Sequence, residues 1–285
     1  MAQMKKIVLL LITIISVSTL SSQNVEDQKY LLTTKTNDFG LSILSLTDPY
    51  LSPLTYSGNG IQFEHNSRRF LSITNTKISI QSKLELEAGS LLNPPQTSSM
   101  MYMAMNYGWG AHYHFHPLKG LIVLAGGSWD IGSGIKNVVR NINNPANVDL
   151  ATNLNLSGVA IYDIPLRKRT LRLQLAIETP VFGWMYVPLA GASYYEMFEL
   201  GNLSNISHVS SFINKRSINP KITIDIPFKY YVWQVGLKYQ TLRYSANNMV
   251  FERNEISLMV GTTFDMVTFG GRKRIAPKNF ISPNN

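Results

Sequence analysis

Polar and apolar side chains alternate residue by residue through many segments of this chain. In TKISIQSKLELEAG the isoleucines and leucines share one parity, and lysine, glutamine and glutamate occupy the other. RKRTLRLQLAIET and EISLMVGTTFD repeat the pattern. A period of two sends successive side chains to opposite faces of a β-strand. The chain is therefore expected to form a sheet with one apolar and one polar face.

These strands have the length and two-faced polarity of strands that cross an outer membrane. After the N-terminal residues, no segment has the roughly 20 consecutive apolar residues that a membrane helix needs. Charged residues make up only 15% of the chain and aromatic residues 11%. We expect one all-β domain, an antiparallel transmembrane β-barrel. A soluble β-sandwich, which can show the same alternation, is the alternative.

Three connections, FHPLKG, DIPLRK and DIPFKY, join alternating segments through a proline and a basic residue. Because short turns lie on the periplasmic side of such barrels, we place these turns and both termini there. The longer segments 132–150, 180–208 and 88–100 then face outward from the cell. About ten strands are predicted, within a range of eight to twelve, near residues 38–47, 54–65, 69–88, 100–116, 119–132, 150–164, 166–180, 208–227, 229–244 and 253–268.

The N-terminal stretch, MAQMKKIVLLLITIISVSTLSSQN, has the order of a secretory signal peptide: charge, apolar run, small residues. We expect cleavage after Ser18 or Ser21; an uncleaved anchor is the alternative. Without Lys5 and Lys6, 24 basic residues remain against 17 acidic ones, a net charge of +7. This charge favours lipopolysaccharide and phospholipid phosphates as surroundings, and an exported chain is a poor partner for nucleic acid. The chain has no cysteine, which excludes disulfides and thiolate chemistry.

Five stretches, YLSPLTYSGNG, YGWGAHYHFHPLKGL, NNPANVDLATNLNLSG, ASYYEMFELGN and LMVGTTFD, touch most of the chain after about Asp48. They resemble an uncharacterised family of outer-membrane β-barrels from Bacteroidota, a domain of unknown function. The resemblance implies a barrel in the cell outer membrane. It implies no activity and no catalytic residues.

Residues 261–266, GTTFDM, resemble the strand signal by which barrels are recognised for assembly, so the barrel-assembly machinery is an expected partner. Met259 departs from the polar residue usual there, and nineteen residues follow Met266. The C-terminal tail, residues 270–285, is too polar to fold alone. Its basic residues Arg272, Lys273 and Arg274 either contact peptidoglycan or inner-leaflet phosphates, or are simply solvated. We thus expect a signal peptide at 1–21, an N-terminal periplasmic segment at 22–37, a barrel at 38–269 and a basic periplasmic tail at 270–285.

His112, His114 and His116 share the polar face of one predicted strand, about 7 Å apart. A metal site would need another ligand from a neighbouring strand. Across the PLK turn, the expected opposite residues are leucine, isoleucine and glycine, at positions 124, 122 and 120, which cannot ligate. We therefore expect wall residues, with no metal and no cofactor.

The same register tests a hydrolase interpretation. It places Ser128 and Asp130 on the polar face, opposite Gly108 and Asn106. Ser128 would then lie about 13 Å from His112, too far for a nucleophile and its base. No familiar catalytic motif is present, so no catalytic residue is predicted.

The polar parity of the predicted strands gives a charged lumen. At eight to ten strands side chains fill a barrel, so opposite charges are expected to pair and an open porin is disfavoured. A narrow polar path is the alternative at twelve strands. The candidate ligand contacts are Lys83, Asp130, Arg172, Glu178, His112 and His114. The predicted lumen comprises Lys83, Asp130, Arg172 and Glu178, together with Lys77, Glu85, Glu87, Asn106, Asn153, Asn155, Gln174, Lys221, Asp225, Gln234 and Lys238.

Two outer segments have recognisable chemistry. The amides and carboxylate of VVRNINNPANVD either hold sugars or organise their own loop, and the second interpretation is preferred. SYYEMFELGN has Ser193 and Glu196 at capping-box spacing, with Gly201 as a stop, and predicts a short helix. Its apolar side chains either plug the barrel mouth, which we favour, or meet a partner.

Three functions remain open from the sequence. The first is a structural or surface-binding barrel without catalysis. The second is a small-solute pore or ligand-transfer barrel that uses Lys83, Asp130, Arg172 and Glu178. The third, least favoured, is a hydrolase within the barrel.

Overall fold

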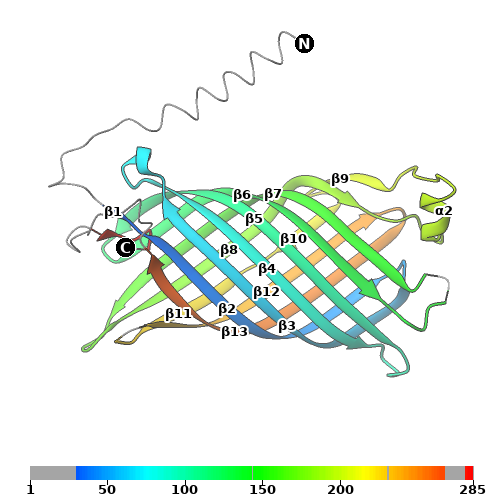
Figure 1. Cartoon of the computed structure of the whole chain (residues 1–285), viewed down its shortest axis with the longest axis horizontal. Coiled ribbons are helices and arrows are strands. Elements are labelled where there is room, and N and C mark those ends of the chain that lie inside the picture. Colours follow the sequence, from blue (N-terminus) through cyan, green and yellow to red (C-terminus); the bar gives the residue numbers. More distant parts are fainter. Residues whose placement is uncertain (1–29, 143, 230, 267–279, 285) are drawn as a thin grey trace, which may run out of the picture.

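The computed structural model describes residues 30–142, 144–229, 231–266 and 280–284. Most of these residues lie in one antiparallel sheet that closes on itself, because β13 pairs with β2 from Glu252 opposite Thr47 to Met266 opposite Thr33 (Figure 1). Among them, no helix has the length and hydrophobicity to cross a membrane. The elements are β1 (Tyr30–Leu31), β2 (Thr33–Asp48), β3 (Ser52–Phe70), η2 (Ser72–Thr74), β4 (Ile78–Leu92), β5 (Ser99–Leu118), β6 (Leu121–Asn137), β7 (Ala146–Pro165), β8 (Thr170–Tyr186), α2 (Tyr194–Phe198), β9 (Ser207–Ser211), β10 (Lys215–Ile218), β11 (Lys221–Pro227), β12 (Val232–Ala246), β13 (Met249–Met266) and β14 (Phe280–Ile281).

The barrel has ten strand positions, although its sheet contains twelve assigned strands. β9, β10 and β11 are consecutive pieces of one strand: β9 pairs with β8, β10 pairs with β12, and β11 pairs with both. Pro220 lies between β10 and β11 and has no N–H to donate to a ladder. The prediction of an all-β antiparallel barrel with about ten strands is confirmed.

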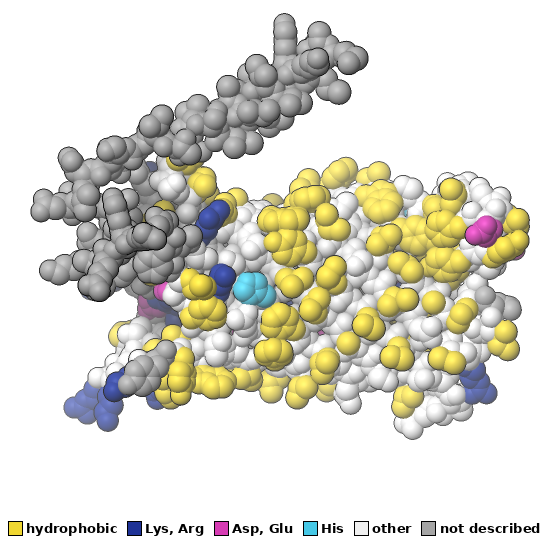
Figure 2. All heavy atoms as spheres, in the orientation of Figure 1, with side chains coloured by type: hydrophobic (Ala, Val, Ile, Leu, Met, Phe, Trp, Pro, Cys, Tyr) yellow, Lys and Arg dark blue, Asp and Glu magenta, His cyan; other side chains and the backbone are white. Residues whose placement is uncertain are grey.

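The alternation in the sequence separates the inside of the barrel from the outside, as predicted. On β5 the methionines and aromatic residues at the odd-numbered positions from Met101 to Phe115 point outward and are exposed, whereas Met100, Tyr102, His112 and His114 point inward and are buried. Apolar side chains accordingly cover much of the outer wall (Figure 2). A sheet that faces hydrocarbon on one side and a polar interior on the other has this pattern.

The two ends of the barrel differ. The connections 71–77, 119–120, 166–169 and the described residues of 228–231 lie at what we call the turn end. The start of β2 and the end of β13 lie there too. The longer connections 93–98, 187–206 and the described residues of 138–145 lie at the opposite end, which we call the loop end, with α2 (Figure 1). The three proline-containing turns therefore share one end with the barrel termini, in the arrangement expected from the sequence.

One predicted turn was misplaced. The predicted strands end at residue 65 and begin again at 69, whereas β3 continues to Phe70 and β4 begins at Ile78. Lys77 was predicted inside the barrel and instead lies exposed in the turn. The cause is the outward face of β3 near its end, where His65, Ser67 and Arg69 replace the apolar residues that mark a strand.

The predicted helix is present as α2. The Ser193 side chain accepts a hydrogen bond from the Glu196 backbone N–H, and the Glu196 side chain accepts one from Ser193 N, which is a complete capping box. Asn247, in the two-residue turn between β12 and β13, donates through Nδ2 to Val187 O at 3.0 Å and Asn205 O at 2.8 Å. The long connection that carries α2 is thereby tied to the barrel rim.

Candidate functional site

A chain of alternating charges crosses the middle of the barrel interior. Its links run from Asp38 to Lys221 (2.7 Å), Glu64 (2.8 Å), Lys238 (3.1 Å), Glu85 (2.5 Å), Lys83 (3.6 Å) and Glu178 (2.5 Å). The seven residues come from β2, β11, β3, β12, β4 and β8, which are six of the ten strand positions. We call this set the ion chain. Each acid in it lies against a lysine, as a buried charge requires.

The four charged residues predicted as ligand contacts are all held by protein groups. Lys83 contacts Glu178, whose other carboxylate oxygen accepts from Ser128. Arg172 donates to both oxygens of Asp163, at 2.8 and 3.1 Å. Asp130 accepts from the amides of two asparagines of β7, at 2.7 and 2.6 Å. These groups stabilise the wall, and their role as ligand contacts stays a prediction.

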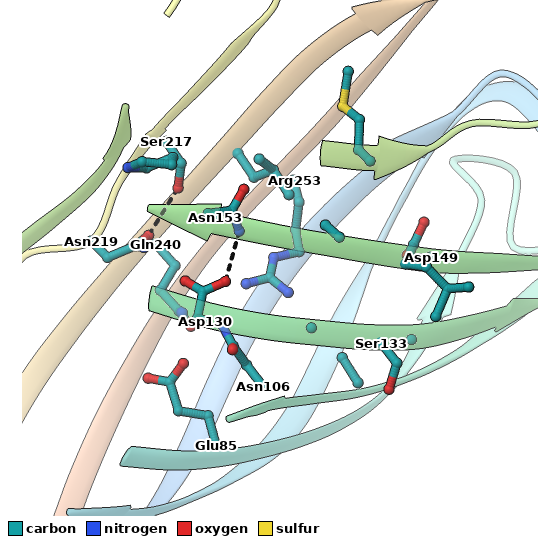
Figure 3. A pocket seen from close by; sticks show the side chains of 18 of the residues that line it. Glu85, Asn106, Asp130, Ser133, Asp149, Asn153, Ser217, Asn219, Gln240 and Arg253 are labelled. Atoms are coloured by element: carbon teal, nitrogen blue, oxygen red, sulfur yellow. Dashed lines mark hydrogen bonds between the residues drawn. The ribbon is translucent and has the colours of Figure 1, made fainter. Parts of the chain in front are cut away.

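A cavity of about 170 Å³ lies on the loop side of the ion chain (Figure 3). Asp130, Asn153, Gln240 and Arg253 surround it, and Figure 3 shows the Asn153 amide directed at Asp130. Lys215 also lines it, buried, with its Nζ 2.7 Å from Asn153 Oδ1. Within the described part of the chain, Lys215 has no carboxylate within 4.0 Å, unlike the lysines of the ion chain.

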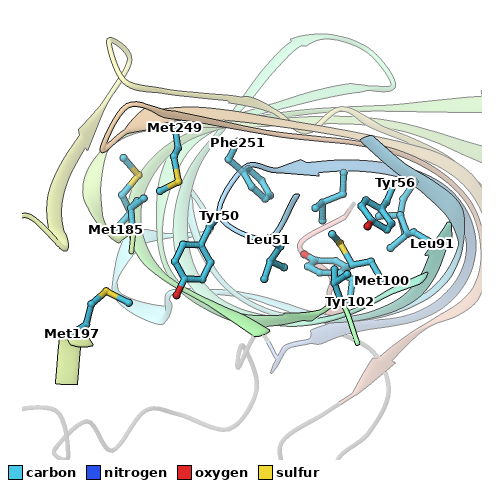
Figure 4. Close-up of a cluster of buried hydrophobic side chains, with 14 residues drawn as sticks. Tyr50, Leu51, Tyr56, Leu91, Met100, Tyr102, Met185, Met197, Met249 and Phe251 are labelled. Carbon is cyan, nitrogen blue, oxygen red and sulfur yellow. The ribbon is translucent and has the colours of Figure 1, made fainter. Parts of the chain in front are cut away.

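Apolar side chains close the loop end of the interior (Figure 4). Tyr50 and Leu51, in the turn between β2 and β3, point into the mouth, and Met197 of α2 is fully buried against the same cluster. The Tyr50 hydroxyl donates to Ala192 O at 2.9 Å. The loop plug, as we name this cluster, comprises Leu44, Leu46, Tyr50, Leu51, Tyr56, Leu91, Met100, Tyr102, Val138, Met185, Val187, Met197, Met249 and Phe251.

The amides of the loop before β7 and of the first residues of β7 serve this closure. Asn147 donates to Asp48 Oδ2 at 2.7 Å and accepts from the Tyr194 hydroxyl at 2.9 Å. Asn141 Nδ2 donates to Leu51 O at 2.9 Å. The loop therefore organises itself and the plug through its amides, as the preferred interpretation of the sequence held.

The turn end is closed by residues from the end of the chain. β14 pairs in parallel with β1, and the next residues, Ser282 to Asn284, are buried. Ser282 Oγ lies 3.1 Å from Thr34 Oγ1, and Arg68 donates to Asn284 Oδ1 at 3.3 Å. A second cavity of about 100 Å³, lined by Asn284, lies between this closure and the ion chain. The closure by these C-terminal residues was not predicted, and the basic run at 272–274 lies outside the described residues.

The three histidines do not form a metal site. His114 Nε2 lies 2.8 Å from Ser79 Oγ, and His116 is exposed near the turn. Within the described ranges no group of three His, Cys, Asp or Glu side chains is placed to hold a metal ion. The predicted register of the hairpin was wrong by two residues, because the strands turn at residues 119–120 and not at PLK, with a one-residue irregularity between Phe115 and Leu118. His112 therefore lies opposite Gly126.

A serine does lie beside His112, but on another strand. His112 Nε2 is 2.9 Å from the Oγ of Ser157 on β7, and both residues line the 100 Å³ cavity. His112 Nδ1 is buried and has no partner among the described residues, so the group that orients the base in a catalytic triad is missing here. Ser128 lies opposite Gly110 and bonds to Glu178 instead.

Sequence reasoning missed Lys215 and Ser157. Lys215 shares the inward parity of Lys221, but Pro220 and the polar residues around it hide the alternation of that strand. Ser157 meets His112 only because β6 between them carries Gly126, which leaves room across that strand. A pair separated by a third strand has no signature in a single sequence.

A closed ten-stranded antiparallel barrel with a polar interior and an apolar outer wall defines a β-barrel of the outer-membrane class. The chain belongs to the family described as Protein of unknown function (DUF3316), whose model matches residues 7–273. No curated protein matches the sequence.

Solved outer-membrane barrels are similar to the chain at the level of the fold. The translocator domain of the autotransporter NalP from Neisseria meningitidis is 8% identical, with a TM-score of 0.45, over 84% of this chain and 90% of that one. The outer membrane protease OmpT from Escherichia coli is 9% identical, with a TM-score of 0.46, over 88% and 100%. The β domain of the Bordetella autotransporter BrkA is 8% identical, with a TM-score of 0.43, over 84% and 100%.

Proposed function

We propose that this protein is a non-conducting outer-membrane barrel that acts as a binding scaffold at its loop end. One observation carries the proposal: the interior is obstructed at three levels, by the loop plug, the ion chain and the residues Ser282 to Asn284. Two small cavities separate these levels. A pore would need a continuous polar path instead.

The loop end offers the surface for binding. Tyr195, Phe198 and Leu200, on and just after α2, are 65%, 55% and 67% exposed, while Met197 of the same helix is buried in the plug. Apolar side chains held in place on one side and exposed on the other are typical of a protein-binding surface. The signal peptide at 1–21, periplasmic turns and an origin in Bacteroidota belong to the same proposal.

Planar-bilayer recording of the purified full chain tests the proposal, with a known porin reconstituted in parallel as the positive control. We expect no stepwise conductance in different salts and no solute-driven swelling of vesicles. Regular conductance steps from the wild-type chain, inserted at the same density as the porin, would refute a non-conducting barrel.

The contact of 2.9 Å between His112 and Ser157 supports a second candidate, a hydrolase within the barrel. An activity-based fluorophosphonate probe separates the two candidates. A hydrolase would be labelled, and the label would be lost in Ser157→Ala but kept in Ser128→Ala, the control serine on the neighbouring strand. The scaffold proposal expects no labelling of any of the three proteins.

A further inference from the structure

The apolar belt of the outer wall is much narrower over β2 and β3 than over β5. Of the eight outward positions from Thr55 to Arg69 on β3, only Ile61 and Phe63 are apolar. The eight outward positions from Met101 to Phe115 on β5 are all apolar or aromatic. This difference in the number of apolar positions is too large to be a local variation in the boundary of one uniform belt.

The neighbouring strand repeats the narrowing. On β2 the outward apolar residues are Phe39, Leu41 and Ile43, and Phe39 and Leu41 lie opposite the two apolar residues of β3. From first to last Cα, this belt spans about 14 Å along the strand, against about 48 Å on β5. At a tilt near 45°, the heights are about 10 Å and about 34 Å, whereas the apolar band of such barrels is about 25 Å tall.

Two of the outward polar residues between this narrow belt and the turn end, Lys35 and Arg69, are basic. Lys35 lies opposite Ser67, and Arg69 lies opposite Thr33, so the two cations are diagonal neighbours on the outer face. No ion pair is formed by either cation within the described ranges. Figure 2 shows basic and histidine side chains toward the turn end of this wall. Unpaired cations beside hydrocarbon favour an anionic partner.

An aromatic wall lies across from these cations. Lys35 and Arg69 line one open groove on the outer surface with Tyr107, Trp109 and Trp129. The two tryptophan rings are stacked, with centroids 5.4 Å apart, and Tyr107 meets Trp109 edge-on at 4.4 Å. One side of the groove thus suits a phosphate and the other an acyl chain, which are the two parts of a phospholipid.

We propose that the outer face of β2 and β3 binds phospholipid head groups. The bilayer leaflet at the turn end is locally thinned beside these strands, so the head groups lie closer to the middle of the barrel than they do elsewhere. Lys35 and Arg69 contact the phosphate, and the tryptophans contact the chain. A second copy of this protein fits the face less well, because a two-fold contact centred there would bring the same cations together.

Site-directed labelling tests the thinning, and the absence of native cysteine makes single-cysteine variants direct. Ser67→Cys and its control Phe115→Cys each lie three residues from the turn end of their strand, and Asn59→Cys and Met105→Cys lie further along β3 and β5. Each carries a bimane label in vesicles of phosphatidylcholine and phosphatidylglycerol. On β3 we expect quenching by a water-soluble quencher, and on β5 by brominated acyl chains. Lipid-type quenching on both strands, or protection from both quenchers on β3, would overturn the proposal.

Lipid retention tests the phosphate contact. In native mass spectrometry, the double variant Lys35→Gln/Arg69→Gln should retain about one third as much phosphatidylglycerol as the wild type, or less. The control Arg167→Gln/Lys168→Gln removes the same charge from the exposed turn between β7 and β8 and should match the wild type. Both variants are checked for heat-modifiable gel mobility, which reports a folded barrel. If the two variants retain the same amount of phosphatidylglycerol, whether both match the wild type or both fall below it, a specific contact is refuted.

Discussion

Replacing Lys221 with methionine is expected to destabilise the barrel more than the same change at Lys238. Both lysines bridge two acids of the ion chain, but what they leave behind differs. Without Lys238, Glu64 still contacts Lys221 at 2.8 Å and Glu85 still contacts Lys83 at 3.6 Å. Without Lys221, Asp38 loses the single lysine that it contacts within the described part of the chain.

The size of each loss follows from these contacts. Removing one partner of a buried ion pair costs about 3–5 kcal/mol, so we expect about 3 kcal/mol for Lys238→Met and about 4–5 kcal/mol for Lys221→Met. Adding Asp38→Asn to Lys221→Met removes the stranded charge and should recover about 2 kcal/mol. The surface pair Arg243–Glu252, at 3.3 Å and largely exposed, gives the control: Arg243→Gln should cost less than about 1 kcal/mol.

The assay is urea-dependent unfolding from phospholipid vesicles, followed by the fluorescence of the four tryptophans. Two results would refute the reasoning. One is an equal loss, within about 0.5 kcal/mol, for the two lysine variants, since such a difference is the usual error of additivity. The other is a double variant no more stable than Lys221→Met alone.

Three further predictions concern the closures. Burial raises the pKa of Tyr50 to about 12, so the stability that Tyr50 contributes is complete below pH 10 and is lost as the pH rises from 10 to 12. Tyr50→Phe should lower the free energy of unfolding by about 1 kcal/mol at pH 8 and should flatten its fall between pH 10 and 12, measured by urea titration. An unchanged pH slope in the variant would contradict this role of Tyr50. Met197→Ala should loosen α2 and speed limited proteolysis of the 187–206 connection, whereas the exposed Tyr195→Ala should not; equal cleavage rates would count against the plug. Deleting residues 280–285 should speed the reaction of Asn66→Cys with a charged thiol reagent by tenfold or more, and no change in rate would mean that these residues do not close the lower cavity.

The strand number and the facing of most side chains follow from the sequence because hydrocarbon and lumen select opposite residues at a period of two. The prediction failed where that selection is absent. On β3, the outward residues around His65 and Arg69 are polar, so the strand resembled a turn and the boundary moved. The misplaced turn and the narrow belt thus have one cause.

The interior was predictable as a composition but not as a set of contacts. The charged residues of the lumen, Lys77 excepted, lie inward and most pair with opposite charges, as expected from the cost of burying charge. Which acid meets which lysine depends on the stagger of the strands around the barrel, and a misplaced turn was enough to shift the predicted partner of His112 by two residues. The closure by Ser282 to Asn284 depends on a parallel pairing between the two ends of the chain, which local pattern does not encode.

The ion chain links Asp38 to Lys221 across 183 residues of sequence. A barrel that has formed β2 and β3 therefore carries Asp38 and Glu64 without the lysines that neutralise them until β11 and β12 are added. Half-finished intermediates are penalised by their own uncompensated charge, and the last hairpins neutralise it as they close the wall. The same residues that obstruct the finished interior thus favour an all-or-none completion of the cylinder during biogenesis.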